Sequence, residues 1–111
     1  MTTIMQGDSY PIYIDLLQDG SPLKPHMIDD LAVYVGESLS KTYSGGGVVF
    51  ENTTSRWYIR PTQAESFALE EGVYDVIVRV KYKNQPESDV KGEEIDRLRV
   101  RAFRGGTQEV L

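Results

Sequence analysis

The chain has 111 residues and no cysteine, and its 12 basic and 17 acidic residues give a formal net charge of −5. This length corresponds to one domain, residues 1–111, which can bury a core without disulfides or a structural metal. The lack of cysteine excludes disulfide bonds, thiolate metal sites and a cysteine nucleophile. The acidic balance argues against nucleic acid or an anionic membrane as a partner.

The first nine residues contain no basic side chain and no long apolar run. They therefore do not have the pattern of a signal peptide, and no stretch of the sequence reaches the length of a membrane span. We expect a protein that is made in the cytoplasm and has no membrane partner.

The first predicted strand covers residues 10–16, where apolar and polar side chains alternate. This period predicts a strand with one buried face, formed by Tyr10, Ile12, Ile14 and Leu16. Asp19-Gly20 then predicts a tight turn, and a short turn at residues 27–30 leads into a second alternating strand at residues 31–35.

Three consecutive glycines, Gly45 to Gly47, separate residues 41–44 from residues 48–52. Glycine permits positive φ, so the simplest interpretation is the tip of a β-hairpin. A phosphate-binding loop is the alternative, but neither a helix nor a Gly-Lys-Ser/Thr motif follows. The hairpin is therefore favoured, and residues 57–60 form the next strand, with Trp57 and Ile59 on one face.

A short helix is predicted near residues 62–70. Thr62 is suited to the N-cap, and Glu65 completes a capping box in which each side chain accepts a hydrogen bond from a backbone N–H at the helix start. Gly72 is suited to a left-handed C-cap that ends the helix.

Residues 73–82 alternate over ten positions, which predicts a long half-buried strand with Tyr74, Val76, Val78, Val80 and Tyr82 facing inward. A turn at residues 83–89, which contain Asn84, then leads into a last strand at residues 90–103. The alternation slips near residues 95–97, where we expect a bulge or bend.

About seven or eight strands with one short helix favour an antiparallel β-sandwich. Residues 69–74 match the Leu-x-x-Gly-x-Tyr pattern of a tyrosine corner, in which the Tyr74 hydroxyl would bond to upstream backbone. The pattern indicates an immunoglobulin-like sandwich, with Val76 where antibody domains carry a cysteine. Trp57 falls on the fifth strand in immunoglobulin lettering (E) rather than the third (C).

No residues for catalysis, for a cofactor or for a metal are predicted. His26 is the only histidine and lies between Pro25 and Met27, and no nucleophile elbow, zinc motif or nucleotide fingerprint occurs. The acidic groups Asp29-Asp30 and Glu93-Glu94-Asp96 do not match an ordered calcium loop. We therefore expect a protein that is not an enzyme.

The basic side chains give more information about function than the histidine or the acidic groups do. If residues 73–82 and 98–103 pair as neighbouring strands, one exposed sheet face carries Arg79, Lys81, Arg97, Arg99 and Arg101. Like charges facing each other on a sheet are destabilising, so this face requires counter-charge. It comes either from Asp75 and Glu side chains of the same molecule or from an acidic protein partner, which would make the face a docking surface.

Tyrosine is abundant, with seven in the chain. Tyr13, Tyr34 and Tyr58 are predicted to face away from the core. Exposed tyrosines suit a protein interface, and they also suit a carbohydrate platform.

Four motifs follow one another along the chain. They are Gly7-Asp8 before the first strand, the turn Asp19-Gly20-Ser21-Pro22, an aromatic strand entering a Thr-Gln-x-Glu helical turn at residues 57–65, and Leu-x-x-Gly-x-Tyr with a Val-rich strand at residues 69–80. In this order the chain resembles small proteins encoded in prophage structural-gene regions of Gram-positive bacteria. The resemblance spans most of the chain.

This resemblance implies a non-enzymatic virion-associated or tail-associated protein, made in the cytoplasm, that self-assembles or docks onto a larger phage protein. Docking would use a free strand edge or the basic face. The alternative is a ligand-binding sandwich of the carbohydrate-binding or adhesin kind.

Overall fold

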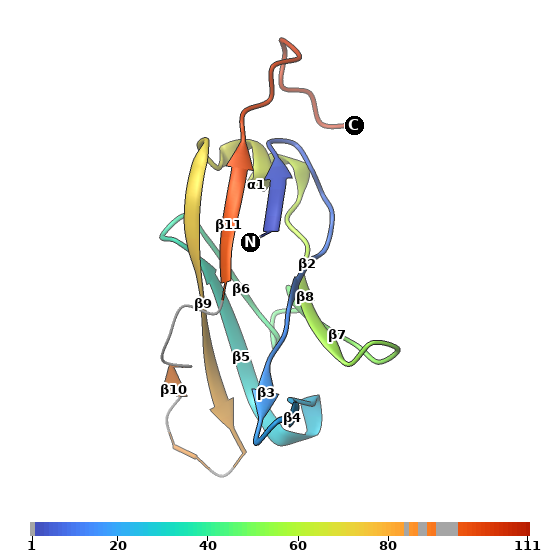
Figure 1. The fold of residues 1–111 in the computed structure, drawn as a ribbon, viewed down its shortest axis with the longest axis vertical. Coiled ribbons are helices and arrows are strands. Elements are labelled where there is room, and N and C mark those ends of the chain that lie inside the picture. Colours follow the sequence, from blue (N-terminus) through green and yellow to red (C-terminus); the bar gives the residue numbers. More distant parts are fainter. Residues whose placement is uncertain (1, 84, 87–88, 91–95) are drawn as a thin grey trace.

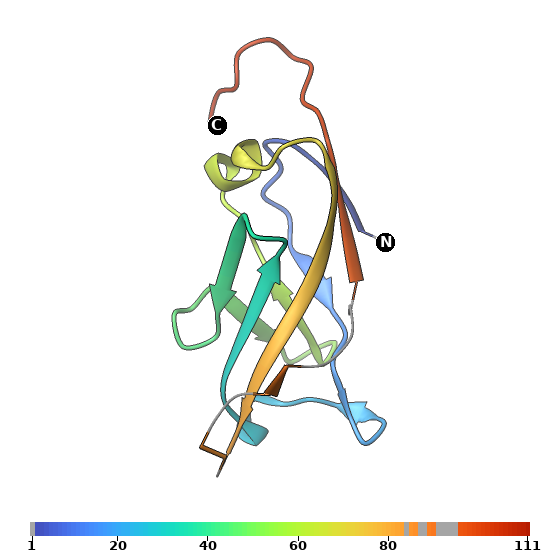
Figure 2. The same ribbon diagram turned by 90° about the vertical axis from the view of Figure 1, so that its left-hand side faces the viewer.

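A computed structural model describes residues 2–83, 85, 86, 89, 90 and 96–111 (Figures 1 and 2). Asn84, the acidic pair Glu93-Glu94 and Ile95, where the bend was predicted to begin, lie outside the described residues.

Most strands of the described residues belong to two sheets. The larger has the order β1 (Thr2–Met5), β11 (Asp96–Arg101), β9 (Gly72–Tyr82), β5 (Ile28–Val35) and β6 (Leu39–Thr42), and β10 (Asp89–Val90) also pairs with β9. The smaller has the order β2 (Ile12–Ile14), β8 (Arg56–Ile59) and β7 (Val48–Glu51). The chain is therefore mainly β, as predicted.

The remaining elements are short. A two-stranded ribbon joins β3 (Leu17–Gln18) to β4 (Ser21–Pro22), and its turn has positive φ at both Asp19 and Gly20. A 3-10 helix, η1 (Pro25–Met27), precedes β5, and α1 (Gln63–Ala68) lies at one end of the sandwich between β8 and β9 (Figure 1). The sheet orders β11-β9-β5-β6 and β2-β8-β7 are those of the strands G-F-C-C′ and B-E-D in immunoglobulin-like sandwiches.

Trp57 is the largest of the fully buried side chains in the described part of the chain. Its side chain is 0% exposed, and its indole Nε1–H donates to the carbonyl oxygen of Leu23 at 2.8 Å. The rings of Tyr43 and Phe50 meet it edge-on at centroid distances of 5.4 and 5.0 Å. Alternate residues of the long strands complete the core, as their period predicts, namely Leu31, Val33 and Val35 of β5, Val76, Val78 and Val80 of β9, and Leu98 and Val100 of β11.

The sandwich is antiparallel in its other strand pairs, but one pair among the described residues, β1 with β11, is parallel. The strand β1 runs in the same direction as β11, with Thr3 opposite Arg99 and Met5 opposite Arg101. The hydrogen bond from Gln6 N–H to the carbonyl of Arg101 continues this pairing. The chain then crosses to the smaller sheet, where β2 begins. The sequence pattern did not reveal β1.

The glycines Gly45 to Gly47 do not form a hairpin tip. The strand before them, β6, pairs with β5, and the strand after them, β7, pairs with β8 in the other sheet. Gly46 N–H bonds to the carbonyl of Tyr43 and Gly47 N–H to that of Thr42. This turn therefore carries the chain from one sheet to the other.

Two further predictions need correction. Tyr10 is 68% exposed, because the ladder with β8 begins only at Ile12 and the preceding residues belong to the crossing from β1. Gly72 is not a left-handed C-cap, because it is the first residue of β9 and its φ is not positive. The helix ends earlier, at Ala68, and its C-cap residue Leu69 has an extended conformation.

We predict that Trp57→Phe lowers the free energy of unfolding by about 3 kcal/mol, because the smaller ring leaves a cavity and the buried carbonyl of Leu23 loses its donor. Urea unfolding followed by circular dichroism measures this change. The matched control, Tyr58→Phe on the opposite face of β8, is expected to cost less than about 0.5 kcal/mol. Equal costs for the two variants would contradict the central role of Trp57.

Candidate docking face

The outward side of the larger sheet is called here the outer face. It consists of the side chains of β1, β11, β9 and β5 that point away from the core. Odd-numbered residues of β11 and β9 point outward, because their even-numbered neighbours are buried. The five basic residues predicted to share a face, Arg79, Lys81, Arg97, Arg99 and Arg101, all have this parity.

The register separates these residues into two groups. Arg97 lies opposite Asp75 and Arg99 opposite Val73, while Arg101 lies beyond the end of β9. Arg79 and Lys81 lie instead opposite Ala32 and Asp30 of β5. At a strand rise of about 3.3 Å per residue, Arg79 is roughly 20 Å from the level of Arg99. The face therefore carries two separate basic groups instead of one continuous stripe.

The group of Arg79 and Lys81 has partners within the molecule. Arg79 donates a hydrogen bond to the Tyr34 hydroxyl at 3.4 Å, and Lys81 faces Asp30 across the strand pair. Burial raises the pKa of Asp30, but hydrogen bonds from Ser44 and Leu31 and the charge of Lys81 outweigh it, and the pKa is lowered overall. In this group, Lys81 therefore faces a carboxylate of the same molecule, and Arg79 has a neutral hydrogen-bond partner.

The group around Arg99 is different. Arg97 pairs with Asp75 at 3.8 Å, and Arg104 pairs with Glu71 at 3.8 Å. Exposed pairs of this kind contribute at most about 1 kcal/mol each. Arg99 and Arg101 form no ion pair with any of the described residues. They point to the same side of one strand, about 7 Å apart, and neither has a counter-charge at ion-pair distance among the described residues.

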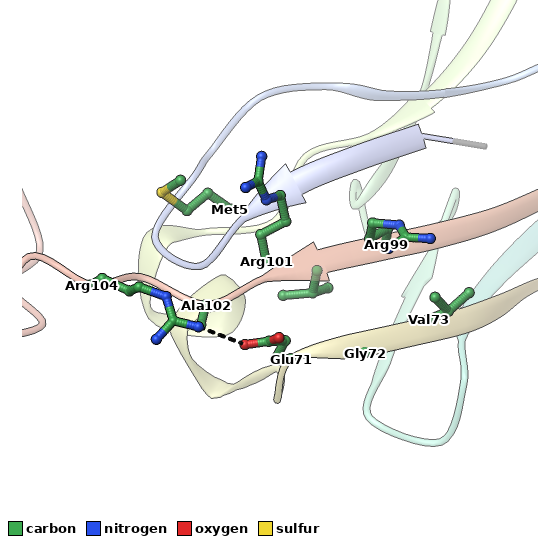
Figure 3. A pocket seen from close by; sticks show the side chains of 9 residues that line it. Met5, Glu71, Gly72, Val73, Arg99, Arg101, Ala102 and Arg104 are labelled. Atoms are coloured by element: carbon green, nitrogen blue, oxygen red, sulfur yellow. Dashed lines mark ion pairs between the residues drawn. The ribbon is translucent and has the colours of Figure 1, made fainter.

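A depression of about 350 Å³ lies beside these two arginines (Figure 3). Met5 of β1 and Val73 of β9 contribute apolar side chains to it, and they are 41% and 47% exposed. Arg104 and Glu71 also line the depression, and their side chains form an ion pair with each other (Figure 3). Exposed apolar side chains and arginines that form no ion pair with the described residues thus lie together at one end of the outer face.

Sequence reasoning missed Met5, because β1 itself was not predicted. The sequence did contain the information needed to place Val73 on the outer face, because the alternation of β9 puts residue 73 on the same side as Asp75.

Helix α1 begins with the capping box read from the sequence. The Thr62 hydroxyl accepts from Glu65 N–H at 3.1 Å, and the Glu65 carboxylate accepts from Thr62 N–H at 2.9 Å. Lys41 of β6 adds a third contact, because its Nζ lies 2.7 Å from the Glu65 Oε1. This hydrogen bond and that from Thr62 N–H hold the pKa of Glu65 below its usual value.

Tyr74 occupies the corner between α1 and β9. Its hydroxyl donates to the carbonyl oxygen of Glu70 at 2.7 Å, which is the geometry of a tyrosine corner. Its ring lies against Gly36, where φ is +52° and where a Cβ atom would come within 2.9 Å of the ring. Gly36 therefore has to be glycine for two reasons, although no sequence motif marks it.

Helix α1 also fixes the end of β1. The buried Ser66 hydroxyl accepts from Gly7 N–H at 2.9 Å and donates to the carbonyl of Met5 at 3.3 Å. Asp8 bonds to Met5 twice, by accepting from its N–H at 2.8 Å and by donating its own N–H to its carbonyl. Met5 is thus held in place at the edge of the depression.

The outward side of the smaller sheet carries an aromatic pair. The rings of Tyr13 and Tyr58 lie 5.5 Å apart with an interplanar angle of 58°. The Arg56 guanidinium covers the Tyr13 ring at 4.5 Å. The Tyr13 hydroxyl donates to Glu51 at 2.9 Å, and this bond raises the pKa of Tyr13. The rings are tilted and partly covered, so they do not form a flat platform.

Within the described ranges, no three His, Asp or Glu side chains group together as metal ligands. Nor does any helix in this part of the chain have the length and apolar character needed to cross a membrane.

Comparison with known proteins finds no significant match to a family model, a curated protein or a solved structure. The fold and the site together define a small β-sandwich. Its outer face presents Arg99 and Arg101, which form no ion pair with the part of the chain that the structure describes, beside exposed apolar side chains.

We predict that Tyr74→Phe lowers the free energy of unfolding by about 1 kcal/mol, because the corner loses one hydrogen bond while the ring still packs on Gly36. Chemical denaturation measures the change, and Tyr10→Phe serves as the control because Tyr10 is exposed and forms no hydrogen bond to the described residues. An unchanged midpoint for Tyr74→Phe would show that the corner bond does not stabilise the fold.

A second prediction concerns pH. The pKa of Glu65 is lower in the folded chain than in the unfolded chain, so its contribution to stability is present above the unfolded value near 4.5 and is lost as pH falls through the lowered folded value. Lys41→Met is expected to lower the melting temperature at neutral pH, with a difference from the parent that shrinks on acidification. Melting curves across this pH range measure it, with Lys24→Met as the control. A difference that stays constant with pH would contradict the Lys41–Glu65 contribution.

Proposed function

We propose that the chain is a non-enzymatic structural or assembly protein of a phage or prophage particle, and that it docks onto another protein through its outer face. The observation that carries the proposal is the meeting of Arg99 and Arg101 with exposed Met5 and Val73 at one depression. Arg and Met are enriched in protein interfaces, where an apolar centre lies beside charged side chains.

The resemblance to prophage-encoded structural proteins supports the same proposal. The motifs that carry this resemblance position one end of the outer face, the end with Arg99, Arg101 and Met5, which is called the docking end. Gly7 and Asp8 fix the end of β1, and the segment with Thr62 and Tyr74 forms the corner against which β1 and β9 are held. In this proposal the protein is synthesised in the cytoplasm and is then incorporated into the particle.

The carbohydrate-binding alternative has weaker support. A sugar platform needs exposed rings that a sugar ring can stack on, whereas Arg56 already covers Tyr13 and the Tyr13 hydroxyl is engaged by Glu51. Tyr34 accepts a hydrogen bond from Arg79 on the other sheet. A glycan array with saturable binding, lost on Tyr58→Ala, would favour this alternative.

The proposal predicts that the protein is a component of purified particles. After induction of the host that encodes it, particles separated on a density gradient are analysed by quantitative mass spectrometry. The chain is expected to follow the major structural subunit through the gradient at a constant ratio, while a cytosolic enzyme of the host is depleted. Its absence from particles and from assembly intermediates would overturn the proposal.

A further inference from the structure

We infer that the end of the outer face around Arg99 and Arg101 binds an extended segment of a partner protein that carries both acidic and apolar side chains. This inference rests on the proposed function and adds the chemistry of the partner and the place where it binds.

Charge complementarity is the first argument. Three arginines border the depression, Arg99, Arg101 and Arg104, while Glu71 is the one acidic side chain among the described residues that line it. The site therefore has a local excess of positive charge in a chain whose formal net charge is −5. Two like charges on one side of a strand repel each other, and a bound carboxylate on each relieves this repulsion.

The spacing of the arginines indicates an extended ligand. Arg99 and Arg101 are two residues apart on β11, so they repeat at about 7 Å along the strand. Alternate residues of any extended segment have the same repeat. A segment with acidic residues at alternate positions therefore offers one carboxylate to each guanidinium, with the two-pronged geometry that arginine favours.

The apolar residues distinguish a protein segment from a nucleic acid. Met5 and Val73 line the same depression and are both close to half exposed. An aliphatic side chain of the partner would cover them and remove apolar area from water. A phosphate backbone would satisfy the arginines, but it would leave these side chains uncovered.

The segment lies across the outer face and does not extend the sheet. Addition of a strand to β1 would need unpaired backbone groups at its free edge. Both backbone groups of Met5 are already bonded to Asp8. Asp8 therefore protects this end of the edge, and recognition depends on side chains.

The test uses synthetic peptides and fluorescence polarisation with the full chain. The probe has the sequence Leu-Ser-Glu-Ser-Glu-Ser-Leu, in which both Glu and both Leu side chains point to the same side of an extended segment. Matched peptides replace either every Glu by Gln or every Leu by Ser. We expect the Glu-Leu peptide to bind, the two matched peptides to bind at least about tenfold more weakly, and binding to weaken as salt is raised.

Two double variants locate the site. Arg99→Gln with Arg101→Gln is expected to weaken binding of the Glu-Leu peptide by about tenfold. Arg79→Gln with Lys81→Gln, the matched control on the same face, is expected to stay within about twofold of the parent. Melting temperatures near that of the parent show that both variants fold.

Three outcomes would overturn the inference. They are equal binding by the Arg99 and Arg101 variant, equal binding of the Glu-Ser peptide, and tighter binding of oligothymidylate than of the Glu-Leu peptide. The last of these would assign the site to nucleic acid.

Incorporation into particles separates this inference from the proposed function. If the parent chain is absent from particles but still binds the Glu-Leu peptide, the proposed function fails alone. If the parent and the Arg99 and Arg101 variant enter particles equally, the inference and docking through this end of the outer face fail, and the place of the chain in a phage particle stands.

Discussion

The register of β11 with its two neighbours decides which charges on the outer face have a partner. Against β9, this register places Arg97 opposite Asp75 and Arg99 opposite Val73. Against β1, it places Met5 opposite Arg101. Because the side-chain period of a strand is two, a shift of one residue in this pairing would turn the arginines toward the core. The composition of the docking end therefore depends on this register.

Helix α1 positions Met5, which lies at the edge of the same site. It is too short to be stable by itself, and its capping box and its contact with Lys41 anchor it to the larger sheet. From this position the buried Ser66 bonds to the backbone of Met5 and Gly7. The Gln6 side chain donates to the carbonyl of Leu69 at 2.7 Å. The segment of α1 and Leu69, for which the sequence indicates only a structural role, thus determines the position of Met5.

The sequence predicts the features that depend on neighbouring residues, such as the alternation of β9, the cap at Thr62 and the turn at Asp19. It does not predict β1, because this short strand forms only through pairing with β11 and bonds to α1, both distant in the chain. The glycines Gly45 to Gly47 fit a hairpin locally, and only the pairing of the flanking strands shows that they join two sheets. The sequence was enough to predict that the basic residues of β9 and β11 point to the same face. The distance between the two basic groups could be obtained only from the register of β11 against β9.

The residue at position 73 makes the isolated chain less stable than an acidic residue there would. Asp75 supplies a counter-charge to Arg97 across the strand pair. An acidic residue at the next outward position would do the same for Arg99, which lies directly opposite. The chain has Val73 there, so the residue opposite Arg99 brings no counter-charge and an apolar side chain is exposed. Both features disfavour the isolated chain, and a partner with acidic and apolar side chains would relieve both at once. A partner that brings charge alone would leave Val73 and Met5 uncovered, and one that brings apolar surface alone would bury Arg99 unpaired.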